Sequence, residues 1–263
     1  MIRVIYRKYG LRIASIWFAP NRDIMNEKKC DIAFYHQILN RDESKQYCSM
    51  SYTLNTDLSC SCEDIMSKFQ KGVRRKVRQA ERAGVETFIY NSKDLSEDNS
   101  IVIEFCKAYN RFLKSKNLPG KCNINAINSY IKEDSFYISC ARYNEMNLVY
   151  HAHLGDDNIA RALYSASLFR LLNDNNEKVL VGQANRLLHW NDILSFKRMG
   201  YCVYDWGGIS KDDDFSGVTE FKKGFGGDFA STYNCIIPCS LLGKAVLTIK
   251  KGLDYIKMLL KIK

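Results

Sequence analysis

Two glycine-containing segments in the last quarter of the chain carry charged side chains that could do chemistry. In the first, Tyr204, Asp205 and Trp206 end a short apolar stretch and are followed by Gly207 and Gly208. A carboxylate at such a strand end can orient or deprotonate a nucleophile, while glycines let a substrate approach the backbone closely. The alternative interpretation is a turn in which Asp205 caps the following loop.

The second segment, 221–228, contains Phe221, Lys222 and Lys223 together with three glycines. Backbone N–H groups and ammonium groups in such an arrangement can stabilise a negative charge, such as a phosphate or a developing oxyanion. The segment lacks the Walker pattern GxxxxGK[ST], so a loop that binds a nucleoside triphosphate is not expected. A solvated turn with two surface lysines is the alternative.

A pair of histidines supplies candidate bases. His151 and His153 alternate on a predicted strand over 148–155 and therefore share a face, and Tyr164 and Ser167 lie on the next predicted strand. Imidazole titrates near neutral pH, so either histidine could accept the proton of an attacking amine. The alternative is that both histidines are structural groups of the core.

The cysteines and acidic residues do not indicate a metal site. The ten cysteines make no CxxC pair, Cys60 and Cys62 have the wrong spacing for a zinc knuckle, and no histidine cluster completes a ligand set. The acidic run 212–214 is expected to be a solvated loop. Cysteines scattered through 263 residues are typical of reduced thiols in a cytoplasmic protein.

The net charge of +10 resides in two segments, 71–82 and 240–263, each with six basic residues and one acidic residue. In the first segment Arg74, Arg75 and Arg78 lie on a predicted helix and suit the phosphates of a nucleotide sugar, a lipid pyrophosphate, CoA or tRNA. A solvated helix face is the alternative. Because the rest of the chain is neutral, the charge indicates local anion-binding patches and not a generally basic surface.

The second basic segment is expected to form an amphipathic helix over 241–262. Its apolar residues recur at steps of four and three: Leu242, Val246, Ile249, Leu253, Ile256 and Leu260. A basic helix of this kind lies in an anionic membrane interface or packs its apolar stripe on the domain or on a partner. The sequence leaves both options open.

The apolar patterns predict an α+β layered fold with a mixed, largely antiparallel sheet flanked by helices. No apolar run is long enough to span a bilayer, and the absence of a cleavage site after the apolar stretch 13–19 predicts that there is no signal peptide. Strands are predicted over 12–18, 31–38, 46–54, 86–90, 135–143, 148–155, 160–168, 202–206 and 229–237, and helices over 61–84, 101–115, 123–132, 181–199 and 219–224. In such sheets ligands bind where strands end or diverge, so a site is expected at the end of the strand over 202–206.

Three motifs resemble the FemABX family of aminoacyltransferases and its relatives of GNAT fold. They are an arginine-rich helix ending in Gly-Val (71–85), a helix and strand that end in Tyr-Asp-x-x-Gly (189–208), and a Phe-Lys-x-Gly-Phe-Gly signature (within 217–233). All three occur in the order that the family shows, over about residues 60–237.

The resemblance implies a GNAT-like acyltransferase that passes an acyl or aminoacyl group to the amine of an amino sugar or of a peptidoglycan or polysaccharide precursor. It places Phe221 and Lys222 at the acyl-transfer site, with Lys222 steadying the oxyanion. It implies no tightly bound cofactor; the donor is acyl-CoA, acyl carrier protein or aminoacyl-tRNA. The CoA-binding pattern of ordinary GNAT enzymes is missing after the strand over 160–168. The alternatives are a tRNA-dependent Fem-type enzyme and a non-catalytic basic protein that binds nucleic acid.

The lengths of the two halves differ from the family pattern. We expect a reduced N-terminal GNAT-like lobe over 1–95, a complete acyltransferase lobe over 96–238, and the terminal helix over 239–263. The expected partner is a phosphate-bearing small molecule or lipid-linked acceptor, with no DNA. The expected location is cytoplasmic, with a peripheral contact on the inner face of the membrane through the terminal helix.

Overall fold

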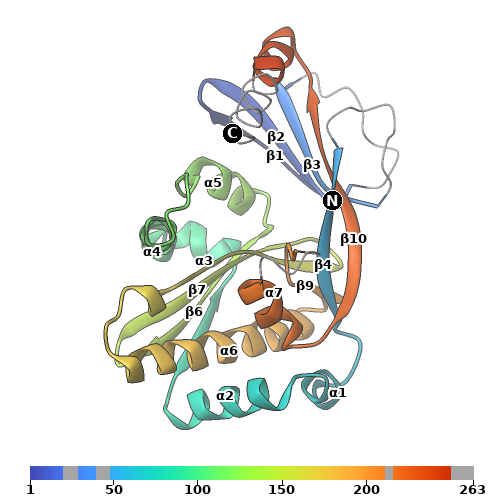
Figure 1. The fold of residues 1–263 in the computed structure, drawn as a ribbon. Helices are drawn as coiled ribbons and strands as arrows, with labels where there is room; N and C mark the ends of the chain where they lie inside the picture. The colour runs from blue at the N-terminus through green and yellow to red at the C-terminus, as the bar shows by residue number, and fades with distance from the viewer. Residues whose placement is uncertain (20–28, 40–47, 211–215, 250–263) are drawn as a thin grey trace, which may run out of the picture. The chain divides into compact units, whose positions relative to one another are not determined.

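The computed structural model describes residues 1–19, 29–39, 48–210 and 216–249. They belong to two compact units (Figure 1): residues 52–230 form the larger one, and residues 1–51 together with the chain from 231 onward form the smaller one. The candidate site lies entirely in the larger unit.

The larger unit is a mixed, mostly antiparallel sheet flanked by helices. Its strands, in spatial order, are β4 (Cys48–Asp57, from Tyr52), β9 (Val203–Asp205), β8 (Ile159–Ser167), β7 (Met146–Gly155), β6 (Phe136–Tyr143) and β5 (Glu86–Tyr90). The β8–β9 pair is parallel, while the pairs from β5 to β8 and the β4–β9 pair are antiparallel. This arrangement confirms the fold class predicted from the sequence.

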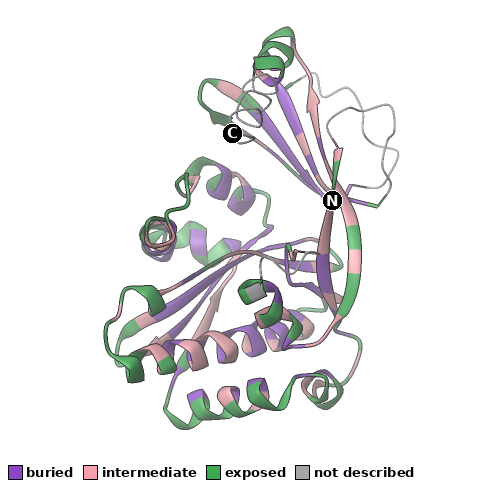
Figure 2. Ribbon diagram, in the orientation of Figure 1, coloured by how far each residue is buried: buried purple, intermediate pink, exposed green. Residues whose placement is uncertain are grey.

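Helices cover both faces of this sheet. They are α1 (Cys62–Ser67), α2 (Lys71–Arg82), α3 (Ser92–Glu97), α4 (Ser100–Ser115), α5 (Ile124–Lys132), the short η1 (Leu168–Arg170), α6 (Asn175–Arg198) and α7 (Ser216–Lys223). Figure 1 shows α2 running alongside α6 on one side, while α4 and α5 lie on the other. Figure 2 shows the buried residues gathered in the strands and on the inner sides of the helices. Strand β7 is buried continuously from Leu148 to Gly155 because helices cover both of its faces.

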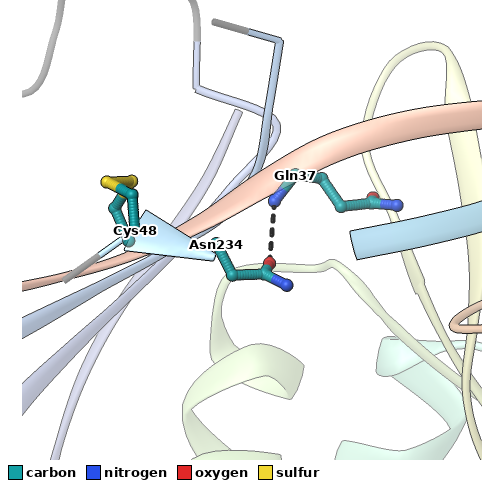
Figure 3. Close-up of a disulfide and its surroundings, with 4 residues drawn as sticks. Gln37, Cys48 and Asn234 are labelled. Carbon is teal, nitrogen blue, oxygen red and sulfur yellow. Dashed lines mark hydrogen bonds between the residues drawn. A yellow bond between two sulfur atoms is a disulfide. The ribbon is translucent and has the colours of Figure 1, made fainter. Parts of the chain in front are cut away.

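The smaller unit contains β1 (Ile2–Lys8), β2 (Leu11–Trp17), β3 (Ile32–Ile38) and the part of β10 (Asp228–Pro238) from Ser231 onward. β1 and β2 form a hairpin, β2 and β3 are parallel, and β10 is antiparallel to β3. A disulfide joins Cys48 to Cys235, beside the hydrogen bond that the Gln37 N–H donates to Asn234 Oδ1 at 3.3 Å (Figure 3).

This disulfide corrects the expectation that all ten cysteines are reduced. Cys48 and Cys235 are 187 residues apart in the chain, so no local spacing reveals the pair. The fold brings β4 and β10 together, and a disulfide requires only that two Cα atoms approach within the reach of the side chains. The other eight cysteines are thiols.

Most predicted elements are present, with a few differences. β1, α3 and η1 were not predicted, α6 begins at Asn175 and not at residue 181, and the helix predicted over 61–84 is broken into α1 and α2 at residues 68–70. Helix α2 packs along α6 and lies in the unit formed by residues 52–230. The predicted division into lobes at residues 95 and 238 stays a prediction.

The terminal helix is described over 241–249, and its continuation to residue 262 lies outside the described residues. Leu247 is buried with Ile13 and Ile32 in the smaller unit, whereas Leu242 and Ile249 of the predicted stripe are exposed. Among the described helices, none combines the length and the hydropathy needed to cross a membrane. Membrane contact by this segment stays a prediction.

Candidate active site

The sheet of the larger unit splits where β8 and β9 diverge. The two strands pair only between residues 159–161 and 203–205. Beyond this point the chain after β9 turns to β4, because the N–H groups of Trp206 and Ile209 donate to the carbonyls of Leu54 and Tyr52 at 3.0 and 2.9 Å. From there to Ser167 β8 pairs with β7 but no longer with β9, so its other edge borders an opening at the predicted strand end.

A pocket of about 1040 Å³ occupies this opening. Its walls come from β7, β8, η1, α4, α6, α7 and the segment after β9, with aromatic side chains such as Tyr164, Trp206 and Phe221. Three cationic side chains line it, Lys116, Arg170 and Lys222, and none of the described residues that line it is Asp or Glu. A pocket with cations and no carboxylates attracts an anionic ligand.

Lys222 reaches the pocket from α7. Its Nζ donates a hydrogen bond to the carbonyl of Gly208 at 2.8 Å. Burial, and to a smaller extent the charge of Arg161, lowers the pKa of Lys222 to about 8. Lys222 is therefore mostly an ammonium group at neutral pH, with its positive charge held at the split between the strands.

Gly207 allows the close approach that forms the split. Its φ is +73°, and a Cβ atom added there would lie 2.6 Å from the carbonyl oxygen of Ala162 on β8. Both the backbone conformation and the lack of space require glycine. The same missing side chain leaves room for Lys222, whose Nζ is 3.6 Å from that Cβ position.

Asp205 is buried beneath the pocket and does not line it. One carboxylate oxygen accepts a hydrogen bond from Arg161 Nη1 at 2.6 Å. The other accepts from the Thr53 hydroxyl and from the Gly207 N–H. Both oxygens are thus occupied by groups that hold β4, β8 and the end of β9 together, which is the geometry of a structural anchor. The predicted role of Asp205 as a base stays a prediction without support from this geometry.

His151 lines the pocket and is held by two partners from α6. Its Nδ1 lies 2.7 Å from Asp192 Oδ2, and its Nε2 lies 2.8 Å from Asn185 Oδ1. His151 and Asp192 are both almost fully buried. The carboxylate fixes the ring and assigns a proton to Nδ1, so Nε2 is the nitrogen that can exchange a proton with the pocket.

His153 points to the same face of β7 but does not line the pocket. Its Nε2 lies 3.1 Å from the Tyr204 hydroxyl and 3.5 Å from Asp192 Oδ2. Burial lowers the pKa of His153 to about 4, so the ring is neutral. Tyr204 is also fully buried and away from the pocket, and burial raises the pKa of its hydroxyl.

His189 is a pocket residue that the sequence analysis did not single out. Its ring lies 3.9 Å from that of His151, centroid to centroid, and its Nδ1 is 3.2 Å from the Tyr204 hydroxyl. Burial lowers the pKa of His189 well below the usual value. The spacing of polar residues in α6 could have indicated His189, because Asn185, His189 and Asp192 recur at steps of four and three and so share one face of the helix.

Ligand atoms of His151, His153 and Asp192 lie within 4.8 Å of one another, close enough to hold a metal ion. The hydrogen bonds argue for another use. His151 and Asp192 already bond to each other, and His153 Nδ1 has no hydrogen-bond partner, whereas a ligating histidine normally donates from its second nitrogen. We therefore treat these residues as a hydrogen-bonded cluster.

The remaining predicted residues divide into two groups. Tyr164, Ser167, Gly208 and Phe221 line the pocket, and their role in substrate binding stays a prediction. Lys223 lies outside the pocket and pairs with Glu220 at 3.0 Å. Arg74 also lies outside it and donates to the carbonyls of Ser67 and Phe69. Arg75 and Arg78 are exposed on α2. The arginine helix is brought to α6 but not into the pocket, so its phosphate-binding role stays a prediction.

No family model and no curated protein sequence matches this chain. Solved structures do match. The C-terminal domain of a putative lysylphosphatidylglycerol synthetase from Agrobacterium fabrum aligns with TM-score 0.56 and 12% identity over 84% of this chain and 72% of its own. FemX aligns with TM-score 0.55 and 14% identity over 78% of this chain and 66% of its own. L-PGS from Bacillus licheniformis aligns with TM-score 0.53 and 10% identity over 94% of this chain and 88% of its own. The chain therefore shares the fold of FemX and of the two lysylphosphatidylglycerol synthetase structures, which confirms the fold that the three motifs predicted.

Proposed function

We propose that this protein transfers an acyl or aminoacyl group to the amine of an amino sugar or another cell-envelope precursor. The observation that carries the proposal is that an ammonium group, Lys222, and a carboxylate-backed imidazole, His151, open onto one pocket. The pocket lies at the split of the sheet in a fold shared with FemX and with lysylphosphatidylglycerol synthetase domains. Acylation of an amine needs a group that stabilises the oxyanion and a base that accepts the proton of the amine, and Lys222 and His151 can supply these two functions.

In the proposed reaction the acceptor amine attacks the carbonyl carbon of the donor, and the carbonyl oxygen takes the negative charge. The Lys222 ammonium stabilises this oxyanion. His151 Nε2 accepts the proton that the amine loses, and the tetrahedral intermediate then collapses and releases the leaving group, which takes up a proton. The amide of Asn185 can present its oxygen or its NH₂ group, so it can pair with either protonation state of Nε2.

An anionic, phosphate-bearing acceptor suits the lining of the pocket. Lys116 and Arg170 provide positive charge in its lining, and burial together with Arg170 lowers the pKa of Lys116. Two cations without a carboxylate partner in the pocket are more stable when an anion lies between them. The aromatic side chains give the flat apolar surface that sugar rings and acyl chains contact.

The start of α6 favours aminoacyl-tRNA over acyl-CoA as the donor. The CoA-binding pattern of GNAT enzymes would follow β8 and use free N–H groups at the start of the next helix to bind phosphate. Here the Asp174 carboxylate accepts from the N–H groups of Asn176 and Glu177 at 2.7 and 2.9 Å. Because a negative side chain already occupies these N–H groups, they are not free for a CoA phosphate, so we place aminoacyl-tRNA first and acyl carrier protein or acyl-CoA second.

A mass-spectrometric transfer assay tests the function and the donor together. The purified protein is incubated with amino-sugar nucleotides and with either a mixture of charged tRNAs or a panel of acyl-CoAs. We expect a product that gains one aminoacyl group with charged tRNA and that disappears when ribonuclease is added first. Ribonuclease-insensitive transfer from acyl-CoA would contradict the order of donors. Salt-dependent RNA binding with no transfer from any donor would instead support the non-catalytic nucleic-acid-binding alternative.

Replacing His151 by glutamine is expected to lower turnover by about 10²- to 10⁴-fold, because it removes the proton acceptor. Asp192→Asn is expected to lower kcat with little change in KM, since the asparagine can no longer fix the imidazole and stabilise its charged form. His36→Gln, in the smaller unit, is the matched control and should keep wild-type turnover. Initial rates and thermal unfolding of all three variants are measured together. Near-wild-type turnover of a folded His151→Gln variant would remove His151 from the mechanism.

A further inference from the structure

Two half-buried thiols face each other in the larger unit. Cys106 lies in α4, and Cys122 lies in the segment that leads from α4 to α5, 16 residues later. Their sulfur atoms are 3.0 Å apart. The N–H of Cys122 also donates to the Asn110 side-chain oxygen at 2.7 Å, which fixes the backbone of Cys122 against α4.

We propose that Cys106 and Cys122 form a reversible dithiol–disulfide pair that fastens the segment before α5 to α4. A disulfide bond is about 2.05 Å long. The two sulfur atoms therefore need to move by only about 1 Å in total to reach the bonded distance. The other closely spaced thiols, Cys60 and Cys62, show no such contact, because Cys60 faces the Asp57 carboxylate at 3.6 Å.

The two thiols differ in pKa, and this difference decides which of them attacks the small-molecule disulfide first. The hydrogen bond between the two sulfur atoms lowers the pKa of Cys106 and raises that of Cys122. Cys106 is therefore the thiolate that attacks. It displaces one thiolate from a small-molecule disulfide and forms a mixed disulfide. Cys122 then loses its proton and attacks the Cys106 sulfur, which releases the second small thiolate. Two protein thiols and one small disulfide thus give one protein disulfide and two small thiols.

The Cys106–Cys122 disulfide would restrain the part of the pocket lining that comes from the end of α4. Phe112 and Lys116 line the pocket from the end of α4, between the two cysteines in sequence. One turn after Cys106, the Tyr109 ring lies 4.9 Å from that of Tyr164, which also lines the pocket. Closing the loop between residues 106 and 122 removes conformational freedom from this segment. Oxidation should consequently make the Lys116 side of the pocket more rigid without altering its lining.

Peptide mapping tests the pair directly in the full-length protein. The protein is treated with reduced or oxidised glutathione under native conditions, alkylated and digested with trypsin without reduction. Cleavage after Lys93, Lys107, Lys121 and Lys132 gives the peptides 94–107 and 122–132, each with one cysteine. We expect these two peptides to be joined after oxidation, about 2 Da lighter than their sum, and to separate again on reduction. Amide hydrogen exchange in residues 108–121 should be slower in the oxidised protein.

Three variants sharpen the result. Cys106→Ser and Cys122→Ser should each abolish the joined peptide, while Cys202→Ser, which removes an exposed thiol, should leave it unchanged. In Cys122→Ser, Cys106 should carry glutathione as a stable mixed disulfide. Full alkylation of both cysteines in folded, oxidised wild-type protein, or bonding of either to a different cysteine, would overturn the proposal. Because this assay needs no substrate, its outcome is independent of the proposed transfer reaction.

Discussion

Alanine in place of Lys222 is expected to lower turnover by about 10²- to 10³-fold, the cost of losing one preorganised group that stabilises an oxyanion. The loss should appear in kcat, because the charge on the carbonyl oxygen develops only in the transition state. Folding should change little, since the group that the ammonium contacts within the protein is the Gly208 carbonyl at the edge of an open pocket. Single-turnover rates and thermal unfolding midpoints of wild type and Lys222→Ala measure the two effects separately.

Lys223→Ala is the matched control for this variant. Lys223 is the next residue of α7, but its ammonium is exposed and pairs with Glu220 outside the pocket. Its removal should leave turnover within about twofold of wild type, as expected for a surface ion pair. Equal losses in both variants would point to a general effect of positive charge on α7. Wild-type turnover in Lys222→Ala would take the lysine out of the mechanism altogether.

The same lysine also predicts a pH dependence. The pKa of Lys222 is about 8, below its usual 10.5. Since the proposed role needs the ammonium form, the rate should fall as pH rises through about 8. Stability should move in the opposite direction. Between about pH 8 and 10.5 the unfolded chain holds a proton at this site that the folded chain has lost, so the free energy of unfolding rises with pH in that window. The Lys222→Ala variant should show neither this fall in rate nor this rise in the free energy of unfolding with pH.

The parts of the site that the sequence predicted are those with strong local signals. The alternation of apolar residues placed His151 on a strand, and the glycines after Asp205 placed a break at the strand end. The Phe-Lys signature placed Phe221 and Lys222 at the pocket. The first two signals depend on neighbours within a few positions in the chain, where backbone geometry sets which side chains share a face, whereas the third is what the family resemblance implies.

The parts that the sequence did not predict depend on contacts between distant elements. Asp192 and Asn185 become partners of His151 only because α6 packs on β7, and Arg161 pairs with Asp205 only because β8 and β9 run parallel for three residues. The Cys48–Cys235 disulfide has the same origin. A basic helix was easy to recognise, but its position alongside α6 and outside the pocket follows from the tertiary packing.

Asp205→Ala is expected to lower the free energy of unfolding by about 3–5 kcal/mol, the cost of leaving a buried charge without its partner. The charge in question is the Arg161 guanidinium, which is nearly buried and donates to Asp205 at 2.6 Å. The Thr53 hydroxyl and the Gly207 N–H would lose their acceptor as well. Urea denaturation of the full-length protein measures the change, and Glu220→Ala, at an exposed ion pair, should cost only about 0–1 kcal/mol.

A second substitution separates the charge effect from the loss of packing. If the cost of Asp205→Ala comes mainly from the orphaned guanidinium, the double variant Asp205→Ala with Arg161→Met should be more stable than Asp205→Ala alone. The isosteric Asp205→Asn distinguishes an anchor from a base. If Asp205 is an anchor, the Asp205→Asn variant should have a lower free energy of unfolding, and its turnover should decrease only in proportion to the folded fraction. If Asp205→Asn instead stays fully folded and loses turnover, the carboxylate acts in the chemistry, and the proton acceptor has to be sought beside Gly207 and not on β7.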